Sequence, residues 1–201
     1  MSNFPRILIP ILILVLIVIY YRKQKTEVTI VKSNLDGDDY IVQNKPDKQK
    51  AAELLAALKI KLTQLVSSLQ KKYPQNEGIK RLATKFQPEK ISEGGKDKNY
   101  TTYTLNKGEK IVFCLRARDE TDRLHDLNLM EFVAIHELAH IMTLSTGHTP
   151  EFQKNFTFIL KEAVDFGLYK PENFRQNPTT YCGIAVTDTP LPEEVFTGKG
   201  K

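Results

Sequence analysis

Three of the four histidines in the chain are gathered in one short stretch. Residues 136–140 read His-Glu-Leu-Ala-His, and His148 follows eight positions after the second of these histidines. On a helix, residues four apart share a face, so the imidazoles of His136 and His140 can converge on one metal ion. Glu137 is turned about 100° from His136, so we expect it to stand beside the ion as a base rather than bind it. This set of residues is what a zinc hydrolase requires.

The residues around the motif separate this prediction from a chance match. A bare motif of this kind also occurs in ordinary amphipathic helices, where the histidines lie at the wet edge. Here the flanking residues, from Met130 to Ile135 and from Leu138 to Met142, are apolar nearly all round, which predicts a buried helix. Polar side chains buried there would be costly unless something binds them. A metal ion would do so.

His148 is the expected third ligand. The buried helix should end near residues 144–145, and Gly147 can adopt the positive φ that reverses the chain towards the ion. The alternative for His148 is an exposed loop histidine. Glu162 is a competing ligand, because some zinc peptidases use a glutamate from the following helix, whereas His125 is expected at a helix start or on the surface.

The expected chemistry follows from this set. Zinc in hydrolases takes three protein ligands, lowers the pKa of a bound water and polarises a carbonyl group. Glu137 would accept the proton of that water and pass it to the leaving amine. Tyr169 and Tyr181 are candidates for steadying the oxyanion, although either could equally be a core residue.

The rest of the chain predicts elements that could position this site. A long helix is expected after residues 46–47, with an apolar stripe that favours packing on the domain's own core over a coiled coil: Ala51, Leu55, Leu58, Leu62, Leu65 and Leu69. Two β-rich runs, 100–105 and 110–116, predict a hairpin, and a second small hairpin is expected within 27–42. Asn128 with Glu131 predicts a capping box for the metal helix, and Thr149 caps a further helix over 150–166. Residues 169–201 are expected to be loops.

An apolar segment precedes these elements. Residues 7–21 carry no charge, and Arg22, Lys23 and Lys25 follow closely. A cleaved signal peptide is the alternative, but no small-x-small cleavage site follows the run. The sequence predicts a single-pass transmembrane anchor over 4–21. The basic residues place the C-terminal domain on the cytosolic side, or inside whatever compartment the membrane encloses.

Length, charge and cysteine content limit the domain organisation and the partners of the chain. With 201 residues, 41% of them hydrophobic, the chain can bury one core. We expect a juxtamembrane tether at 22–45, the catalytic domain at 46–190 and a tail at 191–201. The net charge of +5 comes from dispersed lysines, which allows but does not favour nucleic acid as a partner. Cys114 is expected to be a buried thiol; a disulfide with Cys182 is allowed but not required.

The motif at 136–140, together with Gly-His-Thr-Pro-Glu-Phe at 147–152, resembles the zinc site of SprT-like metallopeptidases and of the related WLM metallopeptidases. The resemblance covers about residues 100–168 and implies that His136, His140 and His148 bind Zn²⁺ and that Glu137 is the catalytic base. The chain lacks the zinc-ribbon cysteines of SprT-like proteins, and its interval between His140 and Gly147 is shorter than theirs. An anchor followed by a compact WLM-like domain is similar to uncharacterised proteins of large DNA viruses, which suggests a viral membrane.

The sequence therefore predicts an α+β zincin-like metallopeptidase domain, with long helices packed on a small antiparallel sheet, behind one N-terminal transmembrane helix. Its expected function is hydrolysis of protein or peptide substrates. Two alternatives are a catalytically inactive, zinc-stabilised adaptor that binds a partner through its long basic helix, and a DNA-associated protease.

Overall fold

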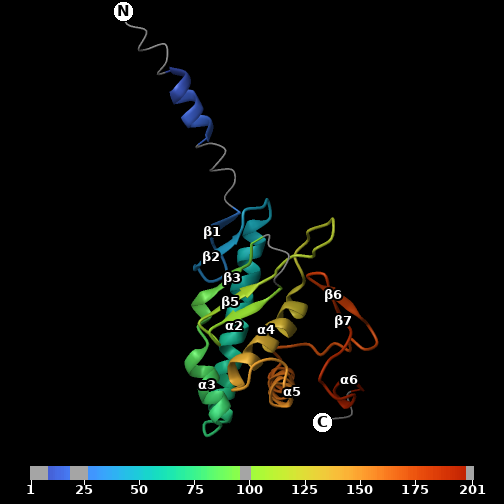
Figure 1. Ribbon diagram of the computed structural model, residues 1–201. Helices are drawn as coiled ribbons and strands as arrows, with labels where there is room; N and C mark the ends of the chain where they lie inside the picture. The colour runs from blue at the N-terminus through green and yellow to red at the C-terminus, as the bar shows by residue number, and fades with distance from the viewer. Residues whose placement is uncertain (1–8, 19–26, 96–100, 198–201) are drawn as a thin grey trace, which may run out of the picture.

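The computed structural model describes residues 9–18, 27–95 and 101–197 (Figure 1). The chain is an α+β protein, as predicted. Its strands are β1 (Val28–Lys32), β2 (Asp39–Gln43), β3 (Ile91–Glu93), β4 (Tyr103–Leu105), β5 (Lys110–Phe113), β6 (Thr179–Tyr181) and β7 (Ile184–Val186). The helices that follow β2 are α2 (Lys48–Lys72), α3 (Glu77–Lys85), α4 (Leu127–Met142), α5 (Pro150–Asp165) and α6 (Glu194–Thr197), with a 3-10 turn at Pro88–Lys90.

The predicted transmembrane anchor and the membrane location derived from it are wrong. Of the expected span 4–21, residues 9–18 form a helix, and the rest lies outside the described residues. Within 9–18, 27–95 and 101–197, no helix combines the length and the apolar character needed to cross a membrane.

The central sheet has the strand order β3-β5-β4. The predicted hairpin is confirmed: β4 runs antiparallel to β5, with Thr104 opposite Ile111. Its turn uses positive φ at Asn106, Lys107 and Gly108. β3 was not predicted and runs parallel to β5, so the sheet is mixed rather than purely antiparallel. Because β4 lies at the end of this order, it forms one edge of the sheet.

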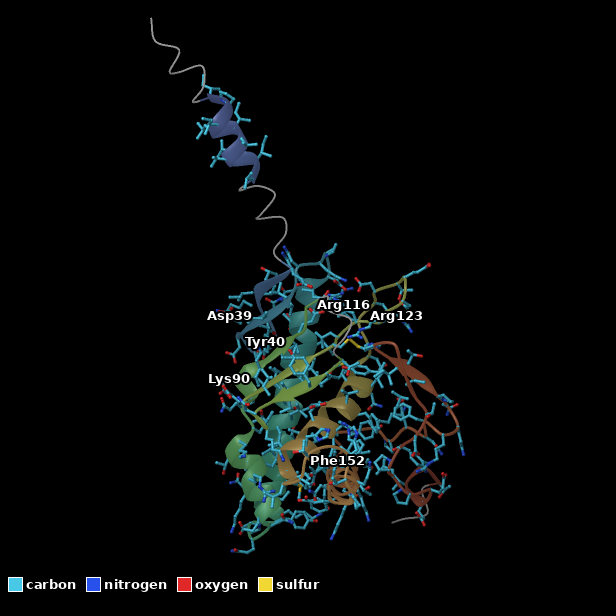
Figure 2. The ribbon with its side chains drawn as sticks, viewed as in Figure 1. Asp39, Tyr40, Lys90, Arg116, Arg123 and Phe152 are labelled. Atoms are coloured by element: carbon cyan, nitrogen blue, oxygen red, sulfur yellow. A yellow bond between two sulfur atoms is a disulfide. The ribbon has the colours of Figure 1, made fainter. Side chains whose placement is uncertain are left out.

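Helix α2 is the longest helix of the domain and packs against several of its elements, including β2, α3 and α4. Its predicted apolar stripe is buried, which confirms that it packs on the chain's own core rather than forming a coiled-coil seam. The predicted β1–β2 hairpin is present, and Tyr40 and Val42 belong to the same core. Tyr40 lies where the hairpin meets α2 (Figure 2). The segment expected as a tether, 22–45, thus contains a hairpin that packs on the domain.

Helices α4 and α5 pack against each other and carry the site. Thr149 caps α5, as expected, by accepting a hydrogen bond from the Phe152 amide. The cap expected for α4 is wrong: Asp126, not Asn128, accepts the Leu129 amide at 3.0 Å. Asn128 instead donates to the Lys170 carbonyl at 3.0 Å. The C-terminal stretch expected to be loops folds into the β6–β7 hairpin and α6, which lie beyond α4 and α5 in Figure 1.

Candidate metal centre

The three predicted ligands meet in the structure. His136 Nε2 lies 3.1 Å from His140 Nε2 and 3.0 Å from His148 Nε2. The ligand atoms of all three residues fall within 4.8 Å of one another. Two nitrogens bound to one tetrahedral zinc ion at about 2.0–2.1 Å would be about 3.3 Å apart. The three histidines could therefore hold a zinc ion.

The protonation of these rings also suits a metal. Burial, reinforced by the neighbouring His140 and His148, lowers the pKa of His136 to about 3. Burial and the neighbouring His148 lower the pKa of His140 to about 4. Both rings are therefore neutral at pH 7 and present lone pairs, which metal binding requires.

Aromatic side chains of α5 hold the rings in place. Phe152 stacks on His140 with 4.2 Å between ring centroids, and it meets His136 edge-on at 4.8 Å. Phe156 contacts His136 from the same helix at 5.1 Å. Figure 2 places Phe152 where α4 and α5 meet. Because both phenylalanines are buried, they limit the rotamers open to the two α4 ligands.

Hydrogen bonds from the β4–β5 turn and from α5 hold the loop that contains His148. Where α4 ends, Lys107 Nζ donates to the carbonyls of Thr143, at 2.9 Å, and Ser145, at 3.0 Å. Glu151, in the first turn of α5, accepts the Leu144 amide at 3.1 Å. Gly147 then reverses the chain with φ of +81°, as predicted. His148 follows directly and faces back towards α4.

Glu137 stands beside the histidines and is not part of their cluster. It is buried, and its Oε2 accepts a hydrogen bond of 2.6 Å from Thr104 Oγ1 on β4. Burial raises the pKa of the Glu137 carboxyl, and the Thr104 hydroxyl opposes this effect. A raised pKa improves a carboxylate as a proton acceptor near neutral pH. No pattern in the sequence indicated Thr104, because a contact between a strand and a helix depends on tertiary packing.

Two cavities open on either side of His136 and Glu137. The larger, of about 650 Å³, is mainly apolar, with walls from α4, α5 and the β6–β7 hairpin that include Phe132, Val133, Phe156, Tyr181, Ile184 and Val186. The smaller, of about 380 Å³, is bounded by β4 and the loop before α5, including Tyr103, Thr104, Lys107, Ser145 and His148. Thr101 and Thr102, like His136, Glu137 and His148, line both cavities.

Other candidate residues lie elsewhere. Glu162, the competing ligand, binds Lys72 Nζ at 2.8 Å and the Tyr73 hydroxyl at 2.7 Å. His125 is half-buried against Tyr181, away from the cluster. Tyr169 packs against Phe132 in the core.

Tyr181 does line the larger cavity, but its hydroxyl donates to the Cys114 carbonyl at 2.8 Å. Its only proton is therefore already engaged. The expected thiol at Cys114 is wrong as well, because Cys114 and Cys182 form a disulfide.

Comparison with known proteins gives relatives among viruses. No family model matches the chain. The uncharacterised protein R325 of Acanthamoeba polyphaga mimivirus is 33% identical over 194 residues, which cover 94% of this chain and 98% of that protein. The uncharacterised protein 136R of Invertebrate iridescent virus 6 is 36% identical over 81 residues, or 40% of this chain and 42% of that protein.

Among solved structures, the crystal structure of Wss1 from Saccharomyces cerevisiae is similar, with a TM-score of 0.46 and 22% identity. The likeness covers 63% of this chain and 87% of that one. The expected similarity to uncharacterised viral proteins is confirmed, whereas the resemblance to SprT-like proteins stays a prediction. On the full-length match, the chain belongs to the family of the uncharacterised mimivirus protein R325.

Proposed function

We propose that the chain is a zinc-dependent peptidase with His136, His140 and His148 as ligands and Glu137 as the general base. The observation that carries this proposal is the convergence of three imidazole nitrogens beside a buried carboxylate that does not join them. A purely structural zinc site normally fills its fourth position with a protein side chain. Here the neighbouring carboxylate is held by Thr104 instead, which suits a base.

The reaction would be hydrolysis of an amide bond. A bound zinc ion would supply Lewis acidity, polarising the carbonyl and acidifying a water molecule. Glu137 would accept a proton from the attacking water as its oxygen bonds to the carbonyl carbon. When the carbon–nitrogen bond breaks, Glu137 would return that proton to the amine nitrogen. The placement of α4 beside the edge strand β4 would suit a zincin-like domain.

The substrate would be an extended peptide. Strand β4 pairs with β5 on one side, and it lies at the edge of the three-stranded sheet in the described part of the chain. A peptide could add to the other side as a further strand, through main-chain hydrogen bonds. It would run over Glu137, since Thr104 of β4 contacts that residue. The apolar cavity of about 650 Å³ would accept a large apolar side chain next to the cleaved bond.

The inactive adaptor remains the alternative from another class. It would use the basic face of α2, but several lysines of that helix are engaged within the domain. Lys59 pairs with Asp36, Lys61 with Glu131 and Lys72 with Glu162. The same pairs reduce the positive charge available to DNA, which makes a DNA-associated protease less favoured. A DNA-stimulated activity that fades with salt would reverse this preference.

The test uses the full chain and separates metal binding from catalysis. We expect one zinc per chain in the wild type and in Glu137→Gln. Peptide hydrolysis should fall at least 100-fold in Glu137→Gln. Equal hydrolysis by wild type and Glu137→Gln on a broad peptide library would refute the peptidase and leave the adaptor.

A matched pair of variants tests the third ligand. His148→Ala should lose tight zinc binding, whereas Glu162→Ala should keep it, because Glu162 is bound to Lys72 and Tyr73 away from the histidines. Zinc stoichiometry and affinity, measured by competition with a chelating dye, decide between the two. The reverse result would make Glu162 the ligand.

A further inference from the structure

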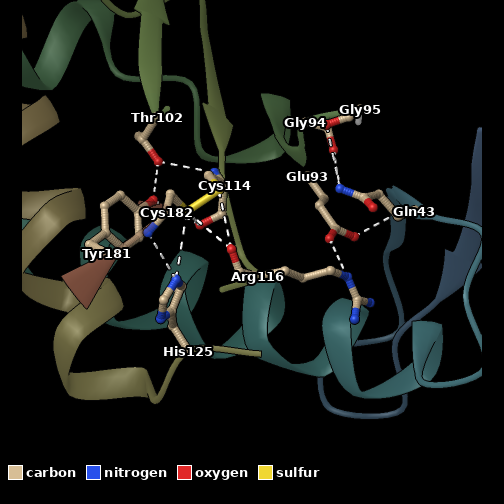
Figure 3. The surroundings of a disulfide bond; sticks show 10 residues. All are labelled: Gln43, Glu93, Gly94, Gly95, Thr102, Cys114, Arg116, His125, Tyr181 and Cys182. Carbon is tan, nitrogen blue, oxygen red and sulfur yellow. Dashed lines mark hydrogen bonds and ion pairs between the residues drawn. A yellow bond between two sulfur atoms is a disulfide. The ribbon is translucent and has the colours of Figure 1, made fainter. Parts of the chain in front are cut away.

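We propose that the Cys114–Cys182 disulfide is a redox-sensitive latch that holds the β6–β7 hairpin as a wall of the apolar cavity. Reduction would then release the hairpin and open that wall. This inference rests on the proposed peptidase function for its consequence, but the latch itself can be tested without any activity. Figure 3 shows the surroundings of the disulfide.

The hairpin is a small element that is joined to the core through Tyr181 and Cys182. Strands β6 and β7 pair with each other and form a separate two-stranded sheet. Cys182 and Gly183 make the two-residue turn, with φ of +47° and +82°. Such a turn normally uses Asn or Gly at its first position, because positive φ is unfavourable for other side chains. A cysteine there is explained by its bond to Cys114, at the end of β5.

The hairpin contributes directly to the cavity next to Glu137. Tyr181, Ile184 and Val186 line this cavity, as do residues 187–190, which follow β7. Ile184 is 54% exposed although it lines the cavity, so it is not part of the buried core. The position of the hairpin therefore sets the width of the space that would receive a substrate side chain.

Contacts of Arg175 join the two ends of the segment that contains the hairpin. Arg175 Nε binds Asp188 Oδ1 at 2.6 Å, and Arg175 Nη1 donates to the Leu191 carbonyl at 3.3 Å. Phe174 and Leu191 are buried on the two sides of this clamp. The clamp would keep the base of the segment in place while its tip moves.

The tip is held by the disulfide and a few polar contacts. The Cys182 amide donates to His125 Nε2 at 3.3 Å, and the Tyr181 hydroxyl donates to the Cys114 carbonyl at 2.8 Å (Figure 3). The Tyr181 hydroxyl also bonds to Thr102. Without the covalent link, these neutral hydrogen bonds would have to hold the tip together with the packing of Tyr181 against His125. The disulfide is thus the covalent constraint on the tip, in addition to the burial of Tyr181 in the core.

The redox step needs a dithiol reductant. One thiolate of the reductant would attack the sulfur of Cys114, the less buried partner, and the bond between the two cysteine sulfurs would break. The second thiol of the reductant would then close a disulfide with the first and release Cys114. Two electrons and two protons pass from the dithiol to the protein, which leaves two cysteine thiols.

The first test measures motion, not activity. Hydrogen exchange of the full chain should become at least tenfold faster in residues 179–187 after treatment with dithiothreitol, while α4 and β5 exchange as before. The double variant Cys114→Ser, Cys182→Ser should show the fast rate with or without reductant. Unchanged exchange in 179–187 would overturn the proposal. So would faster exchange throughout the chain, since the disulfide would then stabilise the whole fold.

The second test measures substrate preference with the same double variant. This variant leaves the metal ligands and Glu137 unchanged, and because it needs no reductant, zinc is not chelated. The ratio of hydrolysis rates for peptides with phenylalanine and with glycine beside the cleaved bond should fall several-fold relative to the oxidised wild type. An unchanged ratio would overturn the latch as a control of the cavity. A chain that cleaves no peptide in either form would refute the peptidase, and the exchange data would still decide whether the hairpin is released.

Discussion

Thr104 is the residue through which the sheet acts on the proposed base. Its hydroxyl donates to Glu137 Oε2 at 2.6 Å, so it fixes one rotamer of a buried carboxylate. Thr104→Val keeps the shape of the side chain and removes this donor. We expect kcat to fall about tenfold, equivalent to about 1.4 kcal/mol, with KM and zinc affinity nearly unchanged.

Steady-state kinetics and zinc titration of Thr104→Val check this role, and Thr104→Ser, which restores the donor, should recover most of kcat. A valine variant as active as the wild type would show that Glu137 needs no help from β4. An equal loss in the serine variant would point to packing by the methyl group instead.

For single residues, the sequence predicted the contacts between positions that are close in the chain and missed those between distant elements. His136 and His140 could be paired because four residues make about one helical turn, and His148 because Gly147 permits the reversal. Thr104 is 33 positions from Glu137, and Cys114 is 68 positions from Cys182. Such contacts depend on how β4, β5 and the C-terminal hairpin pack, which no local pattern encodes.

The β4–β5 turn stabilises the loop that carries the third ligand, His148. Lys107 places its ammonium group on carbonyls of residues 143–145, where the negative end of the α4 dipole also lies. Lys107→Met should loosen the loop before His148 and weaken zinc affinity several-fold, with a small loss of thermal stability. Lys110→Met, a change of the same kind on β5, is the matched control. Equal zinc affinities in the two variants would contradict this role.

The β1–β2 hairpin is joined to α2 by an ionic cluster that predicts an acid dependence. Although partial burial opposes it, hydrogen bonds from Lys59 and Tyr40 lower the pKa of Asp36 from 3.8 to about 2. A carboxyl group with a lowered folded-state pKa stabilises the protein above its unfolded pKa, and the contribution is lost as the pH falls through the folded pKa. The cluster should therefore contribute fully above about pH 4 and progressively less towards pH 2.

Asp36→Asn tests this dependence. We expect it to lower the free energy of unfolding by on the order of 1 kcal/mol at pH 7, a value reduced for solvent screening. The difference from the wild type should shrink between pH 4 and pH 2, as measured by urea denaturation. Asp39→Asn, at an exposed position of β2, should change stability little at either pH. A constant difference for Asp36→Asn across this range would show that its charge is not the cause.

Elements were predicted well where they are long and poorly where they are short. The stripe along α2 and the caps and prolines around α5 extend over several turns, so the helical period is evident. β3, β6 and β7 have three residues each, too few for alternation to be recognised, whereas the equally short β4 was predicted because it lies in a longer β-rich run, 100–105. β3 forms because it pairs with β5, and β6 and β7 form because they pair with each other. The opposite error occurred near the N-terminus, where hydropathy alone predicted a membrane span, whereas no helix of the described residues is long and apolar enough to cross a membrane.

For the whole molecule, the metal should act as a cross-link between α4 and α5. Two ligands belong to α4, and the third precedes α5, so zinc bound at all three would join the two helices that pack at the centre of the site. A ligand that binds only the folded state at 1,000 times its Kd adds about 4 kcal/mol of stability. We therefore expect zinc to raise Tm by several degrees or more in calorimetry, and a chelator to reverse the shift.

Glu137→Gln should show the full shift, because the base is not a ligand, whereas His136→Ala should show little. A zinc effect that is equal in all three proteins would mean that the ion binds elsewhere, and a shift lost in Glu137→Gln would make the carboxylate a ligand and remove the base from the proposed reaction.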